Sequence, residues 1–472
     1  MVTAAAATSP RGRWATLMAL CAADFLVVLD GLIVAVALPA IQDDLAISTG
    51  TLQWVVTAYL LPFGGLLLLG GRLGDLFGRR RVLLVGLTLF GIGALMAGLA
   101  WAPAALFAGR AVQGSGAAMM APTALALLGA TFSAGSSRNR ALGLWSAAGS
   151  IGIPAGALLG GVLTASFGWR AVLLVSVPAA VGAAVATRWV VPESADPDAP
   201  RGLDLPGAAL VTGAVTLLVF GVVNVEHIDD PIQMIVRSGV PVVAAVTLLA
   251  GLVAVERQSR NPLIPPDTFA LPGLTRANVA GAALPVGLGA VLFLGTLQMQ
   301  RLLGLDPLQT GLAYLVITVP IIAASPLAAR LTTRLGRARV AVAGYLLQSA
   351  GLALLSRIDA GAAVSSLATG FVLVGIGAPL AFVPVTAAAL DAPEERSGLA
   401  SGVFNTVQQV GNALALAVIA TLTAATQTLD GAPEPDDPAS GYGAGFLLAA
   451  SICLIWSLAA ARLSDRRHRP DR

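Results

Sequence analysis

Long apolar runs separated by short polar breaks restrict this chain to the folds of membrane proteins. Fourteen such runs occur along its 472 residues, and each is near the roughly 20 residues with which an α-helix crosses a bilayer. Only 11% of the residues are charged, which is too few for the surface of a soluble domain. We predict an all-α polytopic membrane protein with 14 transmembrane helices. The expected spans are 14–39, 52–70, 82–100, 104–130, 141–164, 171–191, 205–224, 236–255, 277–298, 309–330, 340–356, 365–389, 400–424 and 443–462.

The distribution of arginine predicts how these spans are oriented. All 28 basic residues are arginines, and short loops rich in basic residues remain in the cytoplasm. With both termini in the cytoplasm, 23 arginines fall in cytoplasmic segments, four in external loops and one, Arg110, inside a span. We therefore expect a multi-pass protein of a bacterial cytoplasmic (inner) membrane, with both termini cytoplasmic.

A basic turn lies between the second and third spans. Residues 71–81 read Gly-Arg-Leu-Gly-Asp-Leu-Phe-Gly-Arg-Arg-Arg, which resembles the signature of the major facilitator superfamily at the same place. The resemblance marks Gly71, Asp75, Gly78, Arg79 and Arg80 as candidate motif and gating residues. We predict that Asp75, Arg79 and Arg80 act as a conformational latch and not as a cargo site. Asp75 can satisfy backbone donors at a helix end or pair with an arginine of a neighbouring helix, for which Arg110 is one candidate.

Further motifs resemble the fourteen-helix drug:proton antiporter branch of that superfamily, and together they cover nearly the whole chain. These motifs are Leu29-Asp30 with Ala37-Leu38-Pro39, Gln53-Trp54 with Tyr59-Leu60, Leu203 to Gly207, Pro262 to Pro265, Asp306 to Leu312 and Gly398 to Gly402. Leu32 and Ala35 depart from the branch, which usually has a threonine and an asparagine there. The resemblance implies a major facilitator fold of two six-helix bundles with two extra helices between them.

We expect three parts along the chain. Residues 1–191 form the N-terminal six-helix bundle, 192–260 the linker and two additional transmembrane helices, and 261–472 the C-terminal six-helix bundle with a cytoplasmic tail. Residues 329–339 repeat the rhythm of the basic turn, with Thr333 in place of the acid. Such an echo indicates parallel repeats, with the substrate site between them near the middle of the membrane.

Charged residues inside spans are costly and mark functional sites by default. Arg110, Gln113 and Gly114 share one face of the fourth helix and resemble the superfamily's Arg-x-x-Gln-Gly motif. An arginine reaching to the nearer interface is the alternative. Asp30 lies in an apolar run and is our first candidate for the coupling proton, and Asp24, on another face of the same helix, is the second. A structural acid bonded to a neighbouring helix is the alternative for both.

Two further sets of residues are candidates for function. A glycine stripe in the fifth span allows close helix packing and resembles the antiporter signature of exporters, although a pure packing role is the alternative. Its members are Gly149, Gly152, Gly156, Gly160 and Gly161. Polar and aromatic side chains could line a substrate cavity, although a hydrogen-bond network that stabilises the bundle is an equal alternative. They are Gln53, Trp54, Tyr314, Gln348, Asn405 and Gln409.

The predicted function is proton-coupled export of a small hydrophobic or amphipathic compound by alternating access, with drugs, dyes and secondary metabolites all open as cargo. The alternatives are a proton-coupled symporter or facilitator for a small metabolite and, from another class, a membrane-embedded enzyme. Neither histidine lies in a span, so we found no catalytic triad there, and no metal site or phosphate-binding loop is expected. We expect no enzyme activity, no cofactor beyond the coupling proton, no nucleic-acid partner, and a monomer in the lipid bilayer.

Overall fold

The computed structural model describes residues 10–132, 136–194, 205–223, 235–258, 272–359, 362–389, 397–429 and 439–463. Among these residues there are helices and turns but no strand, which confirms the predicted all-α class. Three of the helical segments are π-helices and carry the letter η. The helices are α1 (Pro10–Leu45), α2 (Thr49–Leu52), α3 (Trp54–Phe77), α4 (Arg79–Gly98), α5 (Pro103–Thr131), α6 (Ser136–Phe167), α7 (Trp169–Leu174), α8 (Ser176–Val190), α9 (Leu205–Val223), η1 (Ile235–Gly239), α11 (Val240–Gln258), α12 (Pro272–Gly281), α13 (Leu284–Ala290), η3 (Val291–Gly295), η4 (Gln298–Leu302), α14 (Pro307–Ala313), α15 (Leu315–Leu335), α16 (Arg337–Leu355), α17 (Ser366–Ala389), α18 (Ser397–Leu429) and α19 (Ala439–Ala460).

Most of the predicted spans are long enough to cross a membrane. In the described part, 12 helical stretches have the length and apolar composition of a membrane span. The two remaining predicted ranges, 141–164 and 205–224, lie in α6 and α9, where the fully described apolar stretches are Pro154–Phe167 and Ala209–Leu218. The multi-pass membrane fold is therefore confirmed, whereas the count of fourteen stays a prediction.

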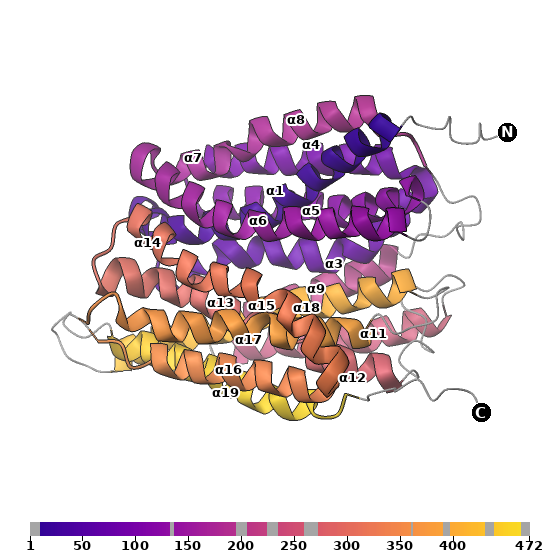
Figure 1. Cartoon of the computed structure of the whole chain (residues 1–472). Helices are drawn as coiled ribbons and strands as arrows, with labels where there is room; N and C mark the ends of the chain where they lie inside the picture. The colour runs from indigo at the N-terminus through magenta and orange to yellow at the C-terminus, as the bar shows by residue number, and fades with distance from the viewer. Residues whose placement is uncertain are drawn as a thin grey trace, which may run out of the picture.

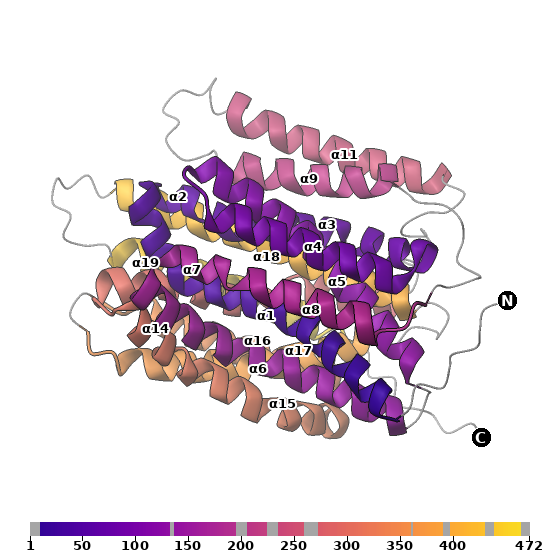
Figure 2. The same ribbon diagram turned by 90° about the horizontal axis from the view of Figure 1, so that it is seen from above.

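The helices form two bundles that lie side by side (Figure 1). We call α1 to α8 the N-half and α12 to α19, with η3 and η4, the C-half. Figure 2 shows α9 and α11 at one edge, where α9 contacts both α3 of the N-half and α18 of the C-half. The first helix begins and the last helix ends at the same end of the molecule, which we call the terminal end, and the other end is the far end (Figure 1).

The predicted repeat of the basic turn is confirmed by the backbone. Helix α3 ends at Phe77, Gly78 follows with φ +102°, and α4 begins at Arg79. The same pattern returns at Gly336, 258 residues later, which has φ +93° between α15 and α16. Only glycine adopts this region readily, because a Cβ would be strained there. Each turn reverses the chain in a single residue.

Glycines also set the closest helix packing in both halves. A Cβ at Gly93 of α4 would lie 2.4 Å from the backbone nitrogen of Gln113 in α5, and a Cβ at Gly344 of α16 would lie 2.2 Å from that of Ala381 in α17. The glycines themselves repeat, since Gly86 and Gly93 correspond to Gly344 and Gly351, each 258 residues later, and Gly109 and Gly116 to Gly370 and Gly377, each 261 later. In a membrane, where lipid is as apolar as a side chain, such close contact is a main source of helix association.

We predict that Gly344→Ala destabilises the C-half. The new methyl group meets the backbone of Ala381, which cannot move cheaply, so the cost is about 1–3 kcal/mol, as for overpacked cores. Thermal unfolding of the detergent-solubilised protein should show a clearly lower melting temperature. Gly182→Ala is the matched control, because no atom lies within 4 Å of a Cβ there. Equal melting temperatures for both variants would contradict the close packing of α16 and α17.

Candidate functional site

A buried ion pair connects α1 and α5. Arg110 Nη1 donates to Asp30 Oδ2 at 2.6 Å and to Gln113 Oε1 at 2.7 Å, while Gln113 Nε2 donates to Asp30 Oδ1 at 2.7 Å. The side chains of Asp30 and Arg110 are 0% and 1% exposed. Both carboxylate oxygens therefore have a partner, as a charge deprived of water requires. The prediction that Arg110 and Gln113 share a face is confirmed, and that face is directed at Asp30.

Helix α3 completes the surroundings of Arg110. The Nε atom of Arg110 donates to the carbonyl oxygen of Val55 at 2.9 Å, and the Arg110 guanidinium lies 4.5 Å from the centre of the Tyr59 ring, in a cation–π contact. Gly114 explains this proximity, because a Cβ there would lie 2.2 Å from the carbonyl oxygen of Tyr59. In the motif, Arg110 and Gln113 thus bind the acid, and Gly114 brings α5 against α3.

The C-half has no such charges at the corresponding places. With the spacing of 261 residues seen for the α5 and α17 glycines, Arg110 corresponds to Phe371 and Gln113 to Val374, both buried. The helix caps at Ser48 and Asp306 are 258 residues apart. With this spacing Asp30 corresponds to one of the residues 286–288, all of which are apolar. The range is three residues wide because the π-turns of η3 and η4 can shift the register by up to two residues. The C-half therefore has apolar residues at the positions that correspond to this ion pair.

The basic turn at the terminal end forms its own ion pair. Asp75 accepts hydrogen bonds from Arg79 Nε at 2.9 Å and from Arg79 Nη2 at 2.7 Å. The suggestion that Asp75 pairs with Arg110 is wrong, because Arg110 is held beside Tyr59, 16 residues or about 24 Å from Asp75 along α3. Gly71 and Gly74 face α5, with Pro122 and Thr123 as the neighbours of an added Cβ.

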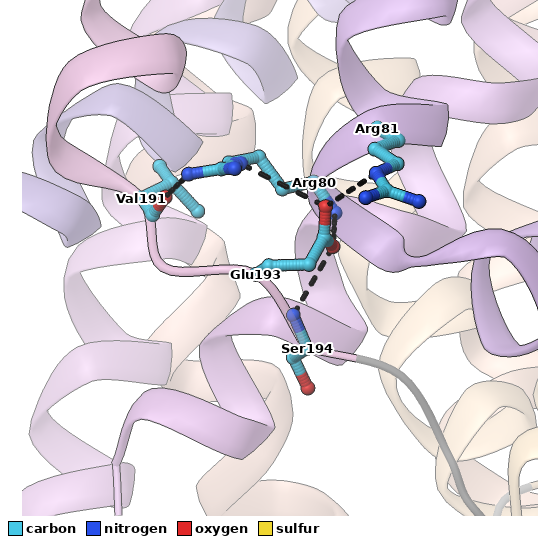
Figure 3. A network of polar contacts seen from close by, with 5 residues as sticks. All are labelled: Arg80, Arg81, Val191, Glu193 and Ser194. Carbon is cyan, nitrogen blue, oxygen red and sulfur yellow. Dashed lines mark hydrogen bonds and ion pairs between the residues drawn. The ribbon is translucent and has the colours of Figure 1, made fainter. Parts of the chain in front are cut away.

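The segment after α8 docks on this turn (Figure 3). Glu193 Oε1 accepts from the backbone N–H of Arg80 at 3.0 Å, and Glu193 Oε2 lies 3.8 Å and 3.6 Å from the Nε atoms of Arg80 and Arg81. The carbonyl oxygen of Ser194 accepts from the N–H of Arg79 at 2.7 Å. Gly78 has no side chain to cap α4, so Glu193 and Ser194 supply acceptors to its first turn from elsewhere in the chain.

Asp24, the second proton candidate, lies apart from the buried ion pair. It is half-buried on α1, and its Oδ2 would lie 3.2 Å from a Cβ on Gly149 of α6. Within the described part of the chain, no arginine forms an ion pair with Asp24. Asp24 and Asp30 thus occupy different surroundings.

The glycine stripe of α6 serves two contacts. Gly149 and Gly152 face Asp24 and Val28 of α1, and Gly156 and Gly160 face the carbonyl oxygens of Leu29 and Ile33 one and two turns further along. Gly161 instead faces the C-half, because a Cβ there would lie 2.6 Å from the carbonyl oxygen of Pro307. The packing role is thus visible, and the link to direction of transport stays a prediction.

The predicted cavity residues divide into two groups. Gln53, Tyr314 and Gln348 are fully buried, with Gln53 Nε2 donating to the carbonyl oxygen of Gly50 at 2.8 Å and Tyr314 Oη 2.5 Å from Thr296 Oγ1. Trp54, Asn405 and Gln409 are at least partly accessible, and Gln409 packs on Gly64 of α3 across the boundary between the halves. Their part in a substrate cavity stays a prediction.

An all-helical membrane protein with repeated halves and an ion pair inside its spans has the architecture of a secondary transporter. The family model described as Major Facilitator Superfamily matches residues 20–264 and 279–472. The chain belongs to this superfamily, which confirms the resemblance predicted from its motifs.

Curated relatives carry names of resistance and export proteins. The chain is 37% identical to the puromycin resistance protein pur8 of Streptomyces alboniger, over 96% of this chain and 92% of that protein. It is 38% identical to the cephamycin export protein CmcT of Amycolatopsis lactamdurans, over 92% of this chain and 89% of that one. For the lincomycin resistance protein of Streptomyces lincolnensis the identity is 34%, over 98% of this chain and 95% of that protein.

Solved structures agree in fold. The peptide transporter POT in complex with sulfate has a TM-score of 0.66 at 16% identity, over 95% of this chain and 96% of that one. The human organic anion transporter MFSD10 has a TM-score of 0.62 at 15% identity, over 95% and 99%. At such low identity these similarities support the fold alone.

Sequence reasoning missed several partners. Tyr59 was part of a recognised motif but was not assigned to the site, and the carbonyl oxygen of Val55 has no sequence signal at all. Glu193 directly follows a proline at the end of the sixth predicted span, which is a signal that could have been used. Its partner Arg80, however, is 113 residues away.

We predict that Arg110→Leu destabilises the protein by about 3–5 kcal/mol, because it leaves the Asp30 carboxylate buried without a counter-charge. The triple variant Asp30→Leu, Arg110→Phe, Gln113→Val reproduces the apolar arrangement of the C-half and should recover most of the lost stability. Thermal unfolding in detergent and the yield of folded protein are the measurements. A triple variant as unstable as Arg110→Leu would show that the pair is required for folding.

Proposed function

We propose that this protein is a proton-coupled antiporter that exports small hydrophobic or amphipathic compounds across the cytoplasmic membrane by alternating access. Its arginine distribution supports cytoplasmic termini. We further propose that it acts as a transporter with no enzymatic step, and that the proton is its only coupling agent. Drugs, dyes and the cell's own secondary metabolites all remain candidate cargo.

The observation that carries the proposal is the buried pair of Asp30 and Arg110. Replacing a buried ion pair by apolar side chains is often neutral or stabilising, so such a pair is weak evidence for a role in stability. The C-half packs apolar residues in the same places. A pair that is not explained by stability, and that contains a titratable acid inside a span, is suited to proton coupling.

The chemistry follows from the geometry of the pair. One proton taken up by the Asp30 carboxylate makes the group neutral and removes the counter-charge of Arg110. Arg110 would keep its bonds to Val55 and Gln113, but it would be a buried cation without an anion. Contacts between α1 and α5 that differ between the two protonation states can shift the populations of the access states. Release of the proton on the other side restores the pair.

Export, and not import, is supported by the relatives' names, which refer to resistance and export. Those names also suggest that the cargo is of the size and character of an antibiotic. The glycine stripe that packs α6 on α1 and on the C-half is consistent with a mobile contact between the halves.

We predict that Asp30→Asn reduces export driven by a pH gradient at least tenfold, with the protein still present and folded in the membrane. The amide keeps the shape and can accept from Arg110, but it cannot release a proton. Ethidium transport into everted membrane vesicles, started by an imposed pH gradient, measures the effect. Wild-type transport should be abolished by a protonophore.

The control for this prediction is Asp359→Asn, which removes a carboxylate from an exposed position at the far end. It should leave ethidium transport unchanged. If Asp30→Asn still exported against a gradient, the coupling proton would be carried elsewhere, and Asp24 would be tested next.

We predict that Asp75→Asn and Glu193→Ala each slow transport while the KM for cargo stays within a few-fold. Both acids hold arginines of the basic turn, and Asp75 lies about 24 Å along α3 from Tyr59 of the Asp30 site. We therefore expect them to act on conformational exchange and not on cargo. Initial rates of transport across a range of ethidium concentrations separate the two parameters. A rise in KM as large as the fall in rate would refute the gating role.

A further inference from the structure

The two halves are joined by polar contacts at the far end. Gln300 Nε2 donates to the carbonyl oxygen of Val36 at 2.9 Å, and Arg301 Nη2 donates to that of Pro39 at 3.2 Å and pairs with the carboxylate of Asp43. Gln300 and Arg301 belong to η4 of the C-half, and their three partners belong to α1 of the N-half. We call these five residues the clasp.

The repeat explains why these residues meet. Gln300 and Arg301 lie 258 residues after Gln42 and Asp43, and the helix caps Ser48 and Asp306 that follow them are separated by the same number. Repeat-related positions next to a two-fold axis contact each other, as they do in a symmetric dimer. Because both halves are parts of one chain, the two positions can carry opposite charges. Asp43 and Arg301 therefore attract where identical residues would repel.

The π-turn of η4 aims the clasp side chains. The N–H of Leu303 bonds to the carbonyl oxygen of Gln298 at 3.0 Å, five residues back instead of four. One extra residue in a turn rotates the following side chains by about 100° relative to a regular helix, and such turns are frequent at functional sites. On the side of α1, Pro39 removes one helical hydrogen bond, and the loosened turn before it contains Val36, whose carbonyl oxygen accepts from Gln300.

We infer that the clasp is the far-end gate of this transporter, closed in the structure and released once in every transport cycle. The inference rests on the proposed alternating access, because a site that opens to one side must be closed on the other. The gate is assigned to α1 and η4, because exposed polar groups of these two helices hold the halves together. A contact of this kind is weak enough to break, since exposed ion pairs contribute little to stability.

The apolar contact beside the clasp can open without loss of hydrogen bonds. There α14 lies against α6, with Gly161 facing Pro307 and Gly311 facing Ala157. Smooth glycine surfaces of this kind gain packing when closed and leave no unpaired polar group when apart. The polar groups of the clasp can bind water once separated, because Asp43 and Arg301 are already 62% and 36% exposed.

The test is the distance between the halves at the far end. Spin labels on Ala104→Cys of α5 and Ser365→Cys before α17 report it in a background with Cys21→Ala and Cys453→Ala, measured by double electron–electron resonance in detergent without cargo. Arg301→Ala should raise the ratio of the longer to the shorter distance about threefold to tenfold. Asp43→Asn and Gln300→Ala should give smaller shifts in the same direction.

The matched control is Arg170→Ala. Arg170 pairs with Asp44 at 2.8 Å, is as exposed as Arg301 and lies at the same end, but both partners belong to the N-half. It should leave the distances unchanged, and the charge exchange Asp43→Arg with Arg301→Asp should restore the shorter distance. Unchanged distances in Arg301→Ala, or an equal shift in Arg170→Ala, would overturn the inference. Because no gradient or cargo is used, failure of proton coupling at Asp30 would not affect this result.

Discussion

Close contact between helix backbones is the constraint on which the rest of this structure depends. Lipid offers helices no hydrophobic drive to associate, so packing distance decides which helices stay together. In each half, four glycines at seven-residue intervals bring two helices together so closely that a methyl group would meet backbone atoms. The same spacing recurs in α4 with α5 and in α16 with α17, and this regular frame allows the two halves to be compared residue by residue.

Within that frame the halves differ in chemistry more than in shape. The N-half places an acid, an arginine and a glutamine where the C-half has apolar side chains. The close approach of α5 to α3 at Gly114 helps to stabilise the arginine inside a span, because it brings Val55 and Tyr59 into contact with Arg110 as additional partners. The buried charge of Arg110 is thus contacted by groups from α1, α3 and α5.

The sequence predicted well what depends on local pattern. Apolar runs predicted the helices, the basic turn and its echo predicted the repeat, and the spacing of Arg110 and Gln113 predicted their common face. The pairing that was predicted wrongly, and the contacts that were missed, depend on segments that lie far apart in the sequence. Arg110 was suggested as a partner of Asp75 because both belong to known motifs. The sequence pattern of one helix, however, does not show which residues of a neighbouring helix lie at the same depth in the membrane. Glu193 on Arg80 and Arg301 on Asp43 are likewise pairings across 113 and 258 residues. The π-turns of η3 and η4 were missed because a single extra residue hardly alters an apolar run.

Helix α1 carries both of the contacts that distinguish this molecule. Asp30 binds Arg110 inside the N-half, and Val36, Pro39 and Asp43 bind the C-half further along the same helix. Asp30 and Asp43 are 13 residues or about 20 Å apart. A shift or rotation of α1 against α5 therefore acts directly on the groups that hold the far end, through one continuous helix. Pro39 lies between the two sites and leaves the far turn of α1 less tightly bound to the rest of the helix. A change of charge at Asp30 can thus act on the contact between the halves through a single helix. On the side of the C-half this contact is made by η4, in which Arg301 is the one residue that forms an ion pair in the described part of the chain.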